Sequence, residues 1–264
     1  MPAKENTLKI LAFILGVWSA DGYIGIYSRG VYRFAITLSA NERDIAKIYQ
    51  SEARKLGIIF KPLRYTNKKK TGAALELNSK DVVNMLLKFG AVPGRKTETN
   101  PPVPKWIKEK PEFIRNWFRG VVLGDGRIGL GCRIAWYRTT RIPSRNPVGQ
   151  KLVNFIVTNP YAQFNRKTNG YRITQMHILK LFNEYVKRYT PRMLEDEIEM
   201  LSTLDIHPRI YYELNYYLKS KRLTATWTIC VWNVNAIRFA RFLEFSKTGW
   251  HASKIRKIIK IESL

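Results

Sequence analysis

The sequence has few cysteines, few histidines and no long apolar run. Its only two cysteines, Cys132 and Cys230, lie far apart, which excludes a disulfide framework and a cysteine-rich zinc or iron–sulfur site. The three histidines lack metal-ligand spacing, which argues against zinc. No segment approaches the roughly 18 apolar residues of a membrane span. We therefore expect a soluble intracellular protein, in the cytoplasm (nucleoid) or in an organellar matrix.

Acidic residues are also scarce. The 264 residues include 46 Lys and Arg against 20 Asp and Glu, a formal net charge of +26. An excess of that size repels itself and weakens the compact state unless a polyanion neutralises it. Hydrophobic residues make up 45% of the chain, enough for a substantial core, so wholesale disorder is excluded. The composition therefore predicts a folded protein with a polyanionic partner.

One short pattern occurs twice in the chain. Residues 13–22 read FILGVWSADG and residues 117–126 read WFRGVVLGDG. The separation is too long for a solenoid period and suits two copies of a domain-sized half. When the copies are aligned, Gly16 matches Gly120, Ala20 matches Gly124, and Asp21-Gly22 matches Asp125-Gly126.

The residues after the first copy predict an αββαββα order. Residues 41–56 have helical apolar spacing, with Asn41 as the cap and Gly57 at the end. Around Ser28-Arg29-Gly30, alternation of apolar and polar residues predicts a hairpin. The other predicted elements of this half are strands at 23–27, 31–38, 58–65 and 73–78 and a helix at 80–89.

The second half repeats this order with additions. Five prolines between 93 and 111 argue against a helix or central strand there and predict a linker. We expect one repeat at 1–92, the linker at 93–111, a second repeat at 112–249 and a basic helical tail at 250–264. An insertion at about 140–170 would include an extra strand at 152–158. The remaining predicted elements are helices at 112–125, 176–188, 192–203 and 235–245, and strands at 126–139, 171–175, 209–219 and 223–232.

The paired small residues predict two helices in close contact. Gly16 and Ala20 lie four residues apart and share one helix face, as do Gly120 and Gly124. Glycine inside a helix costs about 1 kcal/mol relative to alanine. Close approach of another backbone would offset that cost. We expect the helices to pack through these faces about a pseudo-two-fold axis.

The aspartate at the end of each of these helices is unfavourable locally. A carboxylate there faces the negative end of the helix macrodipole, at a cost of roughly 0.3–1 kcal/mol. If the helices pack side by side, Asp21 and Asp125 converge and raise each other's pKa unless cations lie between them. Mg²⁺ held by carboxylates and phosphate oxygens would supply that charge. The pattern therefore predicts a phosphodiester hydrolysis site.

The paired segments resemble the two motifs of the LAGLIDADG homing endonucleases, in the single-chain form. The resemblance implies an α+β fold in which two pseudo-two-fold-related αββαββα repeats form saddle-shaped antiparallel sheets, with the motif helices at the interface. It implies a monomeric, metal-dependent endonuclease that makes a staggered cut in a long, pseudo-palindromic double-stranded DNA site. Such cleavage would promote the mobility of the intron that encodes the protein. Ser19 and Leu123 replace the first Asp of the motif, a position that varies in the family.

The resemblance also implies further site residues. Asp21 and Asp125 would be catalytic and would hold Mg²⁺, with Mn²⁺ or non-catalytic Ca²⁺ as substitutes. Ala20 and Gly124 are assigned to the same metal site. In the family, each half adds a polar residue near a strand end and a lysine after its last helix. The candidates are Gln175, with Leu38 or Ser39 in the first half, and Lys96 and Lys247, with Lys254 as the alternative to Lys247.

Basic and aromatic residues along the strands predict the DNA-contacting surface. Family members lay one curved sheet per half in the major groove, and an antiparallel sheet leaves one face free. In that groove Arg reads guanine and Asn or Gln reads adenine, while many lysines contact only phosphates. Trp136, Tyr211 and Trp227 lie on the same strands. The candidate DNA-binding residues are Tyr27, Arg29, Arg33, Lys61, Arg64, Tyr65, Lys68, Lys69, Lys70, Arg127, Arg133, Arg138, Arg141, Arg172, Arg209, Tyr217, Lys219, Lys221 and Arg222.

Two alternatives to the nuclease remain open. One is an RNA maturase that binds its host intron RNA and assists splicing. The other is a non-catalytic DNA-binding repressor, which would not need both aspartates. Separately, Glu195, Asp196, Glu197 and Glu199 form an acidic cluster on a helix flanked by Lys187, Arg188 and Arg192, and we interpret it as a paired, solvated helix face.

Overall fold

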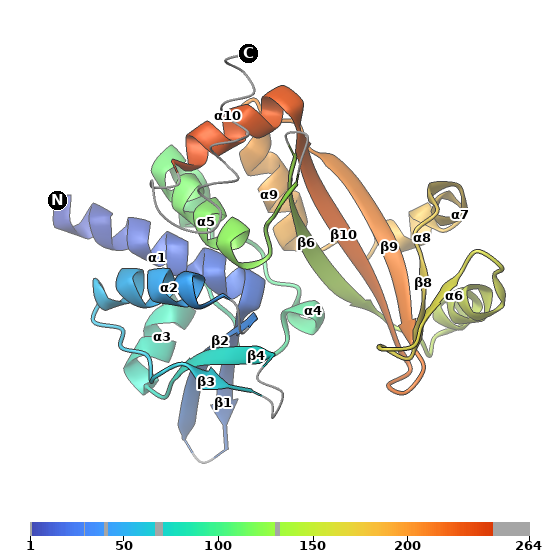
Figure 1. Ribbon diagram of the computed structural model, residues 1–264, viewed down its shortest axis with the longest axis horizontal. Helices are drawn as coiled ribbons and strands as arrows, with labels where there is room; N and C mark the ends of the chain where they lie inside the picture. The colour runs from blue at the N-terminus through green and yellow to red at the C-terminus, as the bar shows by residue number, and fades with distance from the viewer. Residues whose placement is uncertain (1, 29, 40–41, 67–70, 130–132, 245–264) are drawn as a thin grey trace.

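A computed structural model describes residues 2–28, 30–39, 42–66, 71–129 and 133–244 (Figure 1). Within these ranges no helix is both long enough and apolar enough to cross a membrane. Several predictions fall on residues outside this part of the chain. These are the turn residue Arg29, the Asn41 cap, Lys68, Lys69 and Lys70, Cys132, Lys247, Lys254 and the tail at 250–264.

The first repeat follows the predicted order closely. Helix α1 (Pro2–Asp21) leads directly into the hairpin of β1 (Gly22–Tyr27) and β2 (Val31–Ser39). The antiparallel sheet has the order β1-β2-β4-β3. Its other elements are α2 (Arg43–Arg54), β3 (Arg64–Tyr65), β4 (Gly72–Leu77) and α3 (Lys80–Lys88).

Strand β3 is much shorter than the predicted strand at 58–65. Ile58 and Phe60 are buried, so the apolar residues of this segment correctly indicated burial, although they do not form a strand. Pro62 has no N–H to donate to a sheet. Just before it, the backbone N–H of Lys61 donates one hydrogen bond to the Glu76 carbonyl of β4, at 2.8 Å. The segment therefore packs as irregular chain until Arg64.

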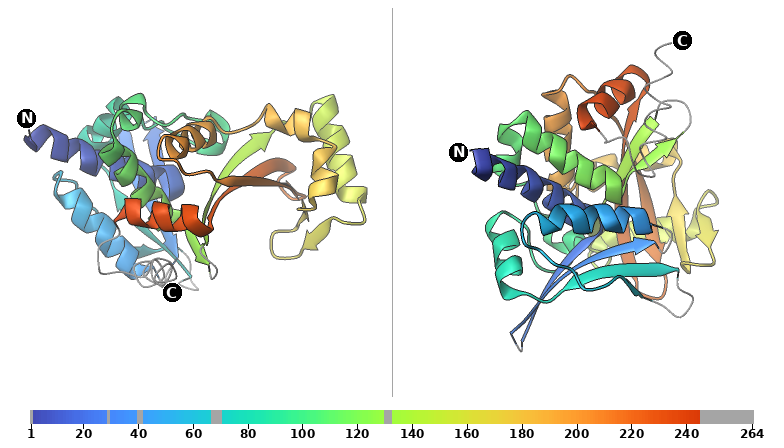
Figure 2. Two further views of the ribbon diagram at one scale, coloured as in Figure 1. Left: turned by 90° about the horizontal axis from the view of Figure 1, so that it is seen from above. Right: turned by 60° about the vertical axis from the view of Figure 1, so that its left-hand side comes forward.

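The second repeat contains a six-stranded antiparallel sheet in the order β5-β6-β10-β9-β8-β7. Helix α5 (Pro111–Gly124) precedes it, and α9 and α10 complete the elements that match those of the first repeat. The additional elements α6, β7, β8, α7 and α8 lie at the far end of this sheet from the first repeat (Figures 1 and 2). The strands are β5 (Arg127–Gly129), β6 (Arg133–Ile142), β7 (Gln163–Asn165), β8 (Gly170–Ile173), β9 (Arg209–Tyr217) and β10 (Arg222–Trp232), and the helices are α6 (Pro147–Thr158), α7 (Met176–Lys180), α8 (Asn183–Lys187), α9 (Arg192–Ser202) and α10 (Asn233–Leu243).

The predicted extra strand at 152–158 is wrong, because these residues belong to helix α6. The Asn146 side chain caps the helix by accepting the Gly149 N–H at 2.6 Å, and proline occupies the first helical position. Leu152 and Ile156, four residues apart, are both fully buried. The β-branched residues of this stretch suggested a strand, but the capping signal and the four-residue spacing decide the structure.

The linker contains two short helical turns, contrary to the prediction of no helix there. Helix α4 (Lys96–Thr99) lies after Pro93, and the 3₁₀ helix η1 (Lys105–Glu109) begins just after Pro104. Prolines limit the length of a helix but allow single turns between them. The turn at α4 matters because it places Lys96 beside the C-terminal end of α1.

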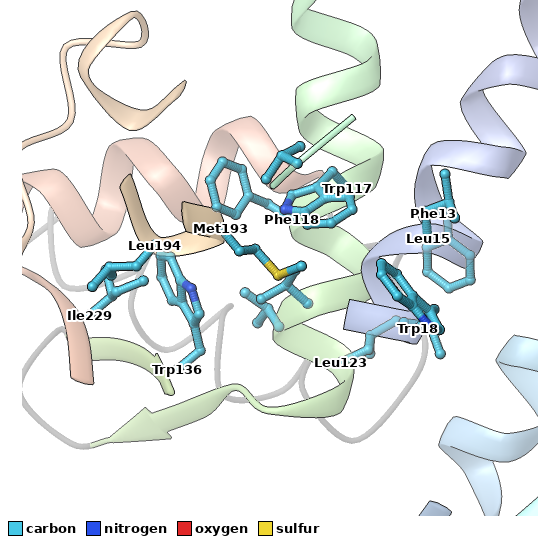
Figure 3. Close-up of a cluster of buried hydrophobic side chains, with 14 of the residues drawn as sticks. Phe13, Leu15, Trp18, Trp117, Phe118, Leu123, Trp136, Met193, Leu194 and Ile229 are labelled. Atoms are coloured by element: carbon cyan, nitrogen blue, oxygen red, sulfur yellow. The ribbon is translucent and has the colours of Figure 1, made fainter. Parts of the chain in front are cut away.

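One hydrophobic core runs across both repeats (Figure 3). Trp18 of α1, Trp117 of α5 and Trp136 of β6 are all fully buried. Phe118 packs edge to face on Trp136, with ring centroids 5.6 Å apart. Helices α1 and α5 lie side by side in the middle of the molecule, so the two sheets flank a shared helical centre (Figures 1 and 2).

Candidate active site

The small residues of α1 and α5 lie where the two helices touch. A Cβ on Gly16 would lie 2.2 Å from the Trp117 carbonyl oxygen, and one on Gly120 would lie 2.3 Å from that of Phe13. Any side chain at these positions would force the backbones apart. The close contact between the two backbones compensates for the stability that glycine costs inside each helix.

The same packing brings the two motif aspartates together at the C-terminal ends of the helices. A Cβ on Gly124 would lie 2.5 Å from the Ala20 Cβ and 3.0 Å from Oδ2 of Asp21. Burial, and next the neighbouring Asp125 carboxylate, raise the pKa of Asp21 to about 7. Burial also raises the pKa of Asp125, against the opposing effect of Arg138 and Lys96. Two desolvated acids thus share one small site.

Lys96 reaches this site from the linker helix α4. Its Nζ donates a hydrogen bond to the Ala20 carbonyl at 2.8 Å and another to the Trp18 carbonyl. Burial lowers the pKa of Lys96 to about 7, although both aspartates favour its charged form. The side chain can therefore gain or lose a proton near neutral pH, beside the residue that precedes Asp21.

Arg138 is part of the site rather than of the DNA-contacting surface, so its prediction as a DNA-binding residue is wrong. It is only 5% exposed, because β6 turns Trp136, Arg138 and Thr140 toward the core. Its Nη1 lies 3.3 Å from Oδ2 of Asp125, and its Nη2 lies 3.2 Å from Oγ of Ser19 in the first repeat. Trp227 faces the core as well and is buried, so neither tryptophan lies on the exposed side of its strand.

Glu197 completes this group, contrary to the prediction of a solvated acidic face. It is fully buried and accepts hydrogen bonds from Nε of Arg138 at 3.0 Å, Trp117 Nε1 at 3.1 Å and Trp136 Nε1 at 3.0 Å. The signal was present in the sequence, since Glu197 lies in the middle of the apolar face of α9. That face is formed by Met193, Leu194, Met200 and Leu201.

Two other members of the acidic cluster, Asp196 and Glu199, are paired, but with a different partner from those predicted. Lys108 of η1 contacts Asp196 at 2.7 Å and Glu199 at 2.8 Å. Lys187 instead pairs with Glu184 on its own helix. The cluster therefore ties α9 to the linker.

Gln175 lies away from the two aspartates, so its assignment to the catalytic site is wrong. It follows β8, one of the added strands, and occupies the N-cap position of α7 on the far side of β9 (Figure 1). The topological counterpart of β2 is β6, because each follows the first strand after a motif helix.

Strand register identifies the true counterparts of Leu38 and Ser39. Tyr23 and Arg127 are each the second residue after a motif aspartate, and they pair with Ala35 and Ala135 respectively. Counting along β2 and β6 from these alanines, Leu38 corresponds to Arg138 and Ser39 corresponds to Thr139. The two halves of the site therefore differ chemically, with leucine on one side and a buried guanidinium on the other.

A cavity of about 240 Å³ opens beside the aspartates, between the end of α1, the linker and β6. Within the described ranges no three His, Cys, Asp or Glu side chains gather as metal ligands. A metal held by Asp21 and Asp125 would need its other ligands from backbone carbonyls, water or a phosphate. The lining residues are Ser19, Ala20, Lys96, Thr97, Asn100, Pro101, Asp125, Tyr137, Arg138, Thr139, Pro191 and Met193.

The face of each sheet opposite the core, here called the free face, is polar and aromatic. On the first sheet Glu76 lies between Arg33 and Arg64 and pairs with both. On the second sheet Arg222 stacks over Tyr217, and Arg133 over the Trp232 ring at 4.8 Å. By strand alternation and register, the free faces carry these predicted residues: Tyr27, Arg33, Arg64, Arg127, Arg133, Arg141, Arg172, Arg209, Tyr211, Tyr217 and Arg222.

The remaining predicted contact residues lie outside the free faces of the strands. Lys61 is exposed before β3, and Tyr65 pairs with Ala73 on the core side of β4. Lys219 and Lys221 are exposed in the turn between β9 and β10. Most of the predicted basic residues are thus available to a ligand that spans both sheets.

Comparison with known proteins supports the fold. Residues 9–90 match the model of the family described as the LAGLIDADG-like domain. A mesophilic variant of the homing endonuclease I-DmoI is 13% identical with a TM-score of 0.52, and the match covers 94% of this chain and 98% of that one. I-DmoI in complex with DNA and Ca gives 13% identity and a TM-score of 0.49, over 96% and 99% of the two chains. The predicted resemblance and the two-sheet α+β fold are therefore confirmed.

Two curated relatives share part of the sequence. The tRNA-splicing ligases RtcB of Methanopyrus kandleri and Pyrococcus abyssi are 28% identical over 142 residues and 26% identical over 181 residues. These matches cover 48% and 62% of this chain but only 14% and 19% of the ligases. The chain spans less than a fifth of the length of these relatives, so the likeness concerns one segment of each ligase.

Proposed function

We propose that this chain, which carries a LAGLIDADG-like domain at residues 9–90 and resembles the LAGLIDADG homing endonucleases in its whole fold, cleaves double-stranded DNA at a specific site. The observation that carries the proposal is the convergence of Asp21 and Asp125 at the ends of two helices, between two sheets with polar free faces. A duplex laid across both sheets would pass over this pair of acids.

The donor set fits a divalent cation. Both aspartates have raised pKa values, from burial and, at Asp21, from repulsion by Asp125, and a cation between them would remove that penalty. Asp21 and Asp125 would hold Mg²⁺, with the backbone of Ala20 and Gly124 beside it, and Mn²⁺ or non-catalytic Ca²⁺ could substitute. When bound, the ion would polarise a phosphate oxygen and lower the pKa of a bound water.

The neighbouring side chains of this chain have complementary roles in the proposal. Lys96 Nζ, whose pKa lies near 7, would exchange a proton at the edge of the site while its hydrogen bonds hold the Ala20 carbonyl in place. Arg138, fixed between Asp125 and Ser19, would keep the second aspartate oriented. Burial of Arg138, with partial burial of Lys96 and Asp125, strengthens the electrostatic effect of these groups.

The finer parts of the proposal follow from the resemblance. One acid per strand would give a staggered double-strand cut in a long, pseudo-palindromic target. The chain would act as a monomer, because a single chain supplies both repeats. Cleavage of an intronless site would promote the mobility of the encoding intron.

Cleavage of the DNA made by joining the exons that flank the encoding intron tests the proposal. We expect cutting of both strands with Mg²⁺ and none with EDTA. Asp21→Asn and Asp125→Asn should each lower the rate by about 100-fold or more, whereas Asp44→Asn, an exposed acid on α2, should have no effect. Absence of cleavage by the wild type with metal present would contradict the proposal. An Asp21→Asn variant that still assists intron splicing would favour the maturase alternative.

A further inference from the structure

We propose that Glu197 is a positioning residue that holds the Arg138 guanidinium at the edge of the active site, in contact with Asp125. Its effect on cleavage rests on the proposed nuclease function. The contacts of Glu197 and Arg138, which connect α9 and β6 to both motif helices, can be tested in the folded chain without DNA.

The contacts of Glu197 account for both of its oxygens. One oxygen accepts from Nε of Arg138 at 3.0 Å and from Trp136 Nε1 at 3.0 Å, and the other accepts from Trp117 Nε1 at 3.1 Å and from Nη2 of Arg138. The Glu197 side chain has no exposed surface and that of Arg138 has 4%. A buried charge is tolerated when it is paired and fully hydrogen-bonded, and this pair meets both conditions.

The far end of the guanidinium points to the site. Nη1 lies 3.3 Å from Oδ2 of Asp125, and Nη2 lies 3.2 Å from the Ser19 hydroxyl, two residues before Asp21 in the other repeat. These contacts are longer than those to Glu197, so Glu197 is the anchor and the site contacts are secondary. The guanidinium therefore joins α9, β6, α5 and the end of α1 at one point.

The arrangement is specific to one half of the molecule. Strand register matches Arg138 with Leu38, so the first repeat has no cation at this position. A residue needed only for the packing of a repeat would be expected in both halves. A guanidinium next to only one of the two acids points to a role at that acid.

Loss of the Glu197 charge would free Arg138 to move toward the aspartates. The other carboxylate in contact with Arg138 is that of Asp125, and Asp21 also raises the pKa of the guanidinium. A guanidinium between the two acids would compete with a divalent cation for the same oxygens. We therefore expect Glu197→Gln to raise the Mg²⁺ concentration for half-maximal cleavage about tenfold, with a smaller change in the rate at saturating Mg²⁺.

Two variants isolate this effect. Glu199→Gln, on the same helix but exposed, should leave the Mg²⁺ dependence unchanged. The double variant Arg138→Leu with Glu197→Gln removes both charges and places leucine where the first repeat has it. If the single variant acts through the freed guanidinium, the double variant should need a several-fold lower Mg²⁺ concentration for half-maximal cleavage than Glu197→Gln alone, even though it lacks the contact between Arg138 and Asp125. If the core is merely damaged, no such rescue should occur, and the inference would be wrong.

A readout without DNA separates this inference from the nuclease proposal. In NMR spectra of the full chain, the Arg138 Nε–H and the indole N–H groups of Trp117 and Trp136 should exchange slowly with solvent. In Glu197→Gln, all three signals should shift, and the Arg138 signal should exchange at least about tenfold faster. Fast exchange of the Arg138 Nε–H with solvent in the wild type would show that Glu197 does not hold Arg138 in place. A wild type that shows the slow signals but cuts no DNA would overturn only the nuclease proposal.

Discussion

At the scale of single residues, the ionisation of Asp21 provides a test that needs no DNA. Burial and Asp125 raise the pKa of Asp21 from 3.8 to about 7, so the folded state binds a proton more tightly than the unfolded state. Stability is therefore lost as pH rises from about 4 to about 7, on the order of 4 kcal/mol in total. Without metal, Asp21→Asn should raise the Tm at pH 8 by roughly 5–10 °C, and by less at pH 5.

Measuring the Tm at pH 8 with added Mg²⁺ tests whether a metal ion relieves the destabilisation caused by the ionised Asp21. Mg²⁺ should raise the Tm of the wild type at pH 8, because a ligand that binds only the folded state stabilises it, and it should raise that of Asp21→Asn much less. Asp44→Asn is the control, since its carboxylate is exposed beside Lys47. An Asp21→Asn variant that is less stable than the wild type at pH 8 would show that Asp21 is ionised without penalty.

The sequence allowed the aspartates to be predicted but not their neighbours. Asp21 and Asp125 occur in a repeated pattern whose spacing fixes a shared helix face, and that information is local. Arg138 and Glu197 lie 59 residues apart and meet only because β6 and α9 pack against α5. In a chain with so many basic residues, no local signal distinguishes the one buried arginine of the described ranges, although the apolar face around Glu197 does mark that residue.

At the scale of elements, the crossing of α1 and α5 depends on glycine. A Cβ on Gly120 would lie 2.3 Å from the backbone oxygen of Phe13, so the helices would have to separate. Gly120→Ala should therefore lower the free energy of unfolding by about 2 kcal/mol or more, even though alanine favours a helix by about 1 kcal/mol. Urea unfolding at pH 7 measures this change.

Gly129→Ala is a suitable control for this prediction. Gly129 is exposed at the end of strand β5, and the nearest atom to a new Cβ there is 3.9 Å away. Its stability should change by less than about 0.5 kcal/mol. Equal effects at Gly120 and Gly129 would mean that the two motif helices do not need close contact.

The type of an element could be predicted where the spacing of its apolar residues agreed with the capping and turn residues at its ends. The hairpin of β9 and β10 and the helices α3 and α5 have clear alternation or capping. The errors at β3 and α6 share a cause, since β-branched and apolar residues report burial more directly than strand geometry. Before β3, Pro62 limits pairing, and at the start of α6, Asn146 caps the helix and Pro147 is its first residue.

At the scale of the whole molecule, the net charge of +26 predicts how binding depends on salt. If six to ten phosphates are neutralised across the two sheets, affinity for target DNA should fall roughly 10³–10⁵-fold between about 50 and 200 mM salt. Fluorescence anisotropy in Ca²⁺ would measure binding without cleavage. A loss of less than about tenfold over that range would contradict a phosphate-dominated interface.

The repeated motif predicted the pseudo-symmetric plan, and the strand expected at 171–175 corresponds to β8, but strand β7 and the widening of the second sheet were not predicted. Strands β7 and β8 are short, contain few apolar residues and join the sheet only through β9. Pairing of that kind depends on the partner strand rather than on the strand's own sequence. The free face of the second repeat is therefore wider than that of the first.

The added strands should extend DNA contact on one side of the cleavage site only. Gln163 and Arg172 pair across β7 and β8 on the free face, and Arg172 is held by Glu213 of β9. Changing Gln163 and Arg172 together to alanine should lower affinity for the target about tenfold and shorten the nuclease-protection footprint at one end. Lys151→Ala, on α6 of the same insertion, should leave both unchanged. Because α1, α5 and the first sheet are untouched, protection at the other end should persist. Equal shortening at both ends would mean that the added strands stabilise the fold instead of contacting DNA.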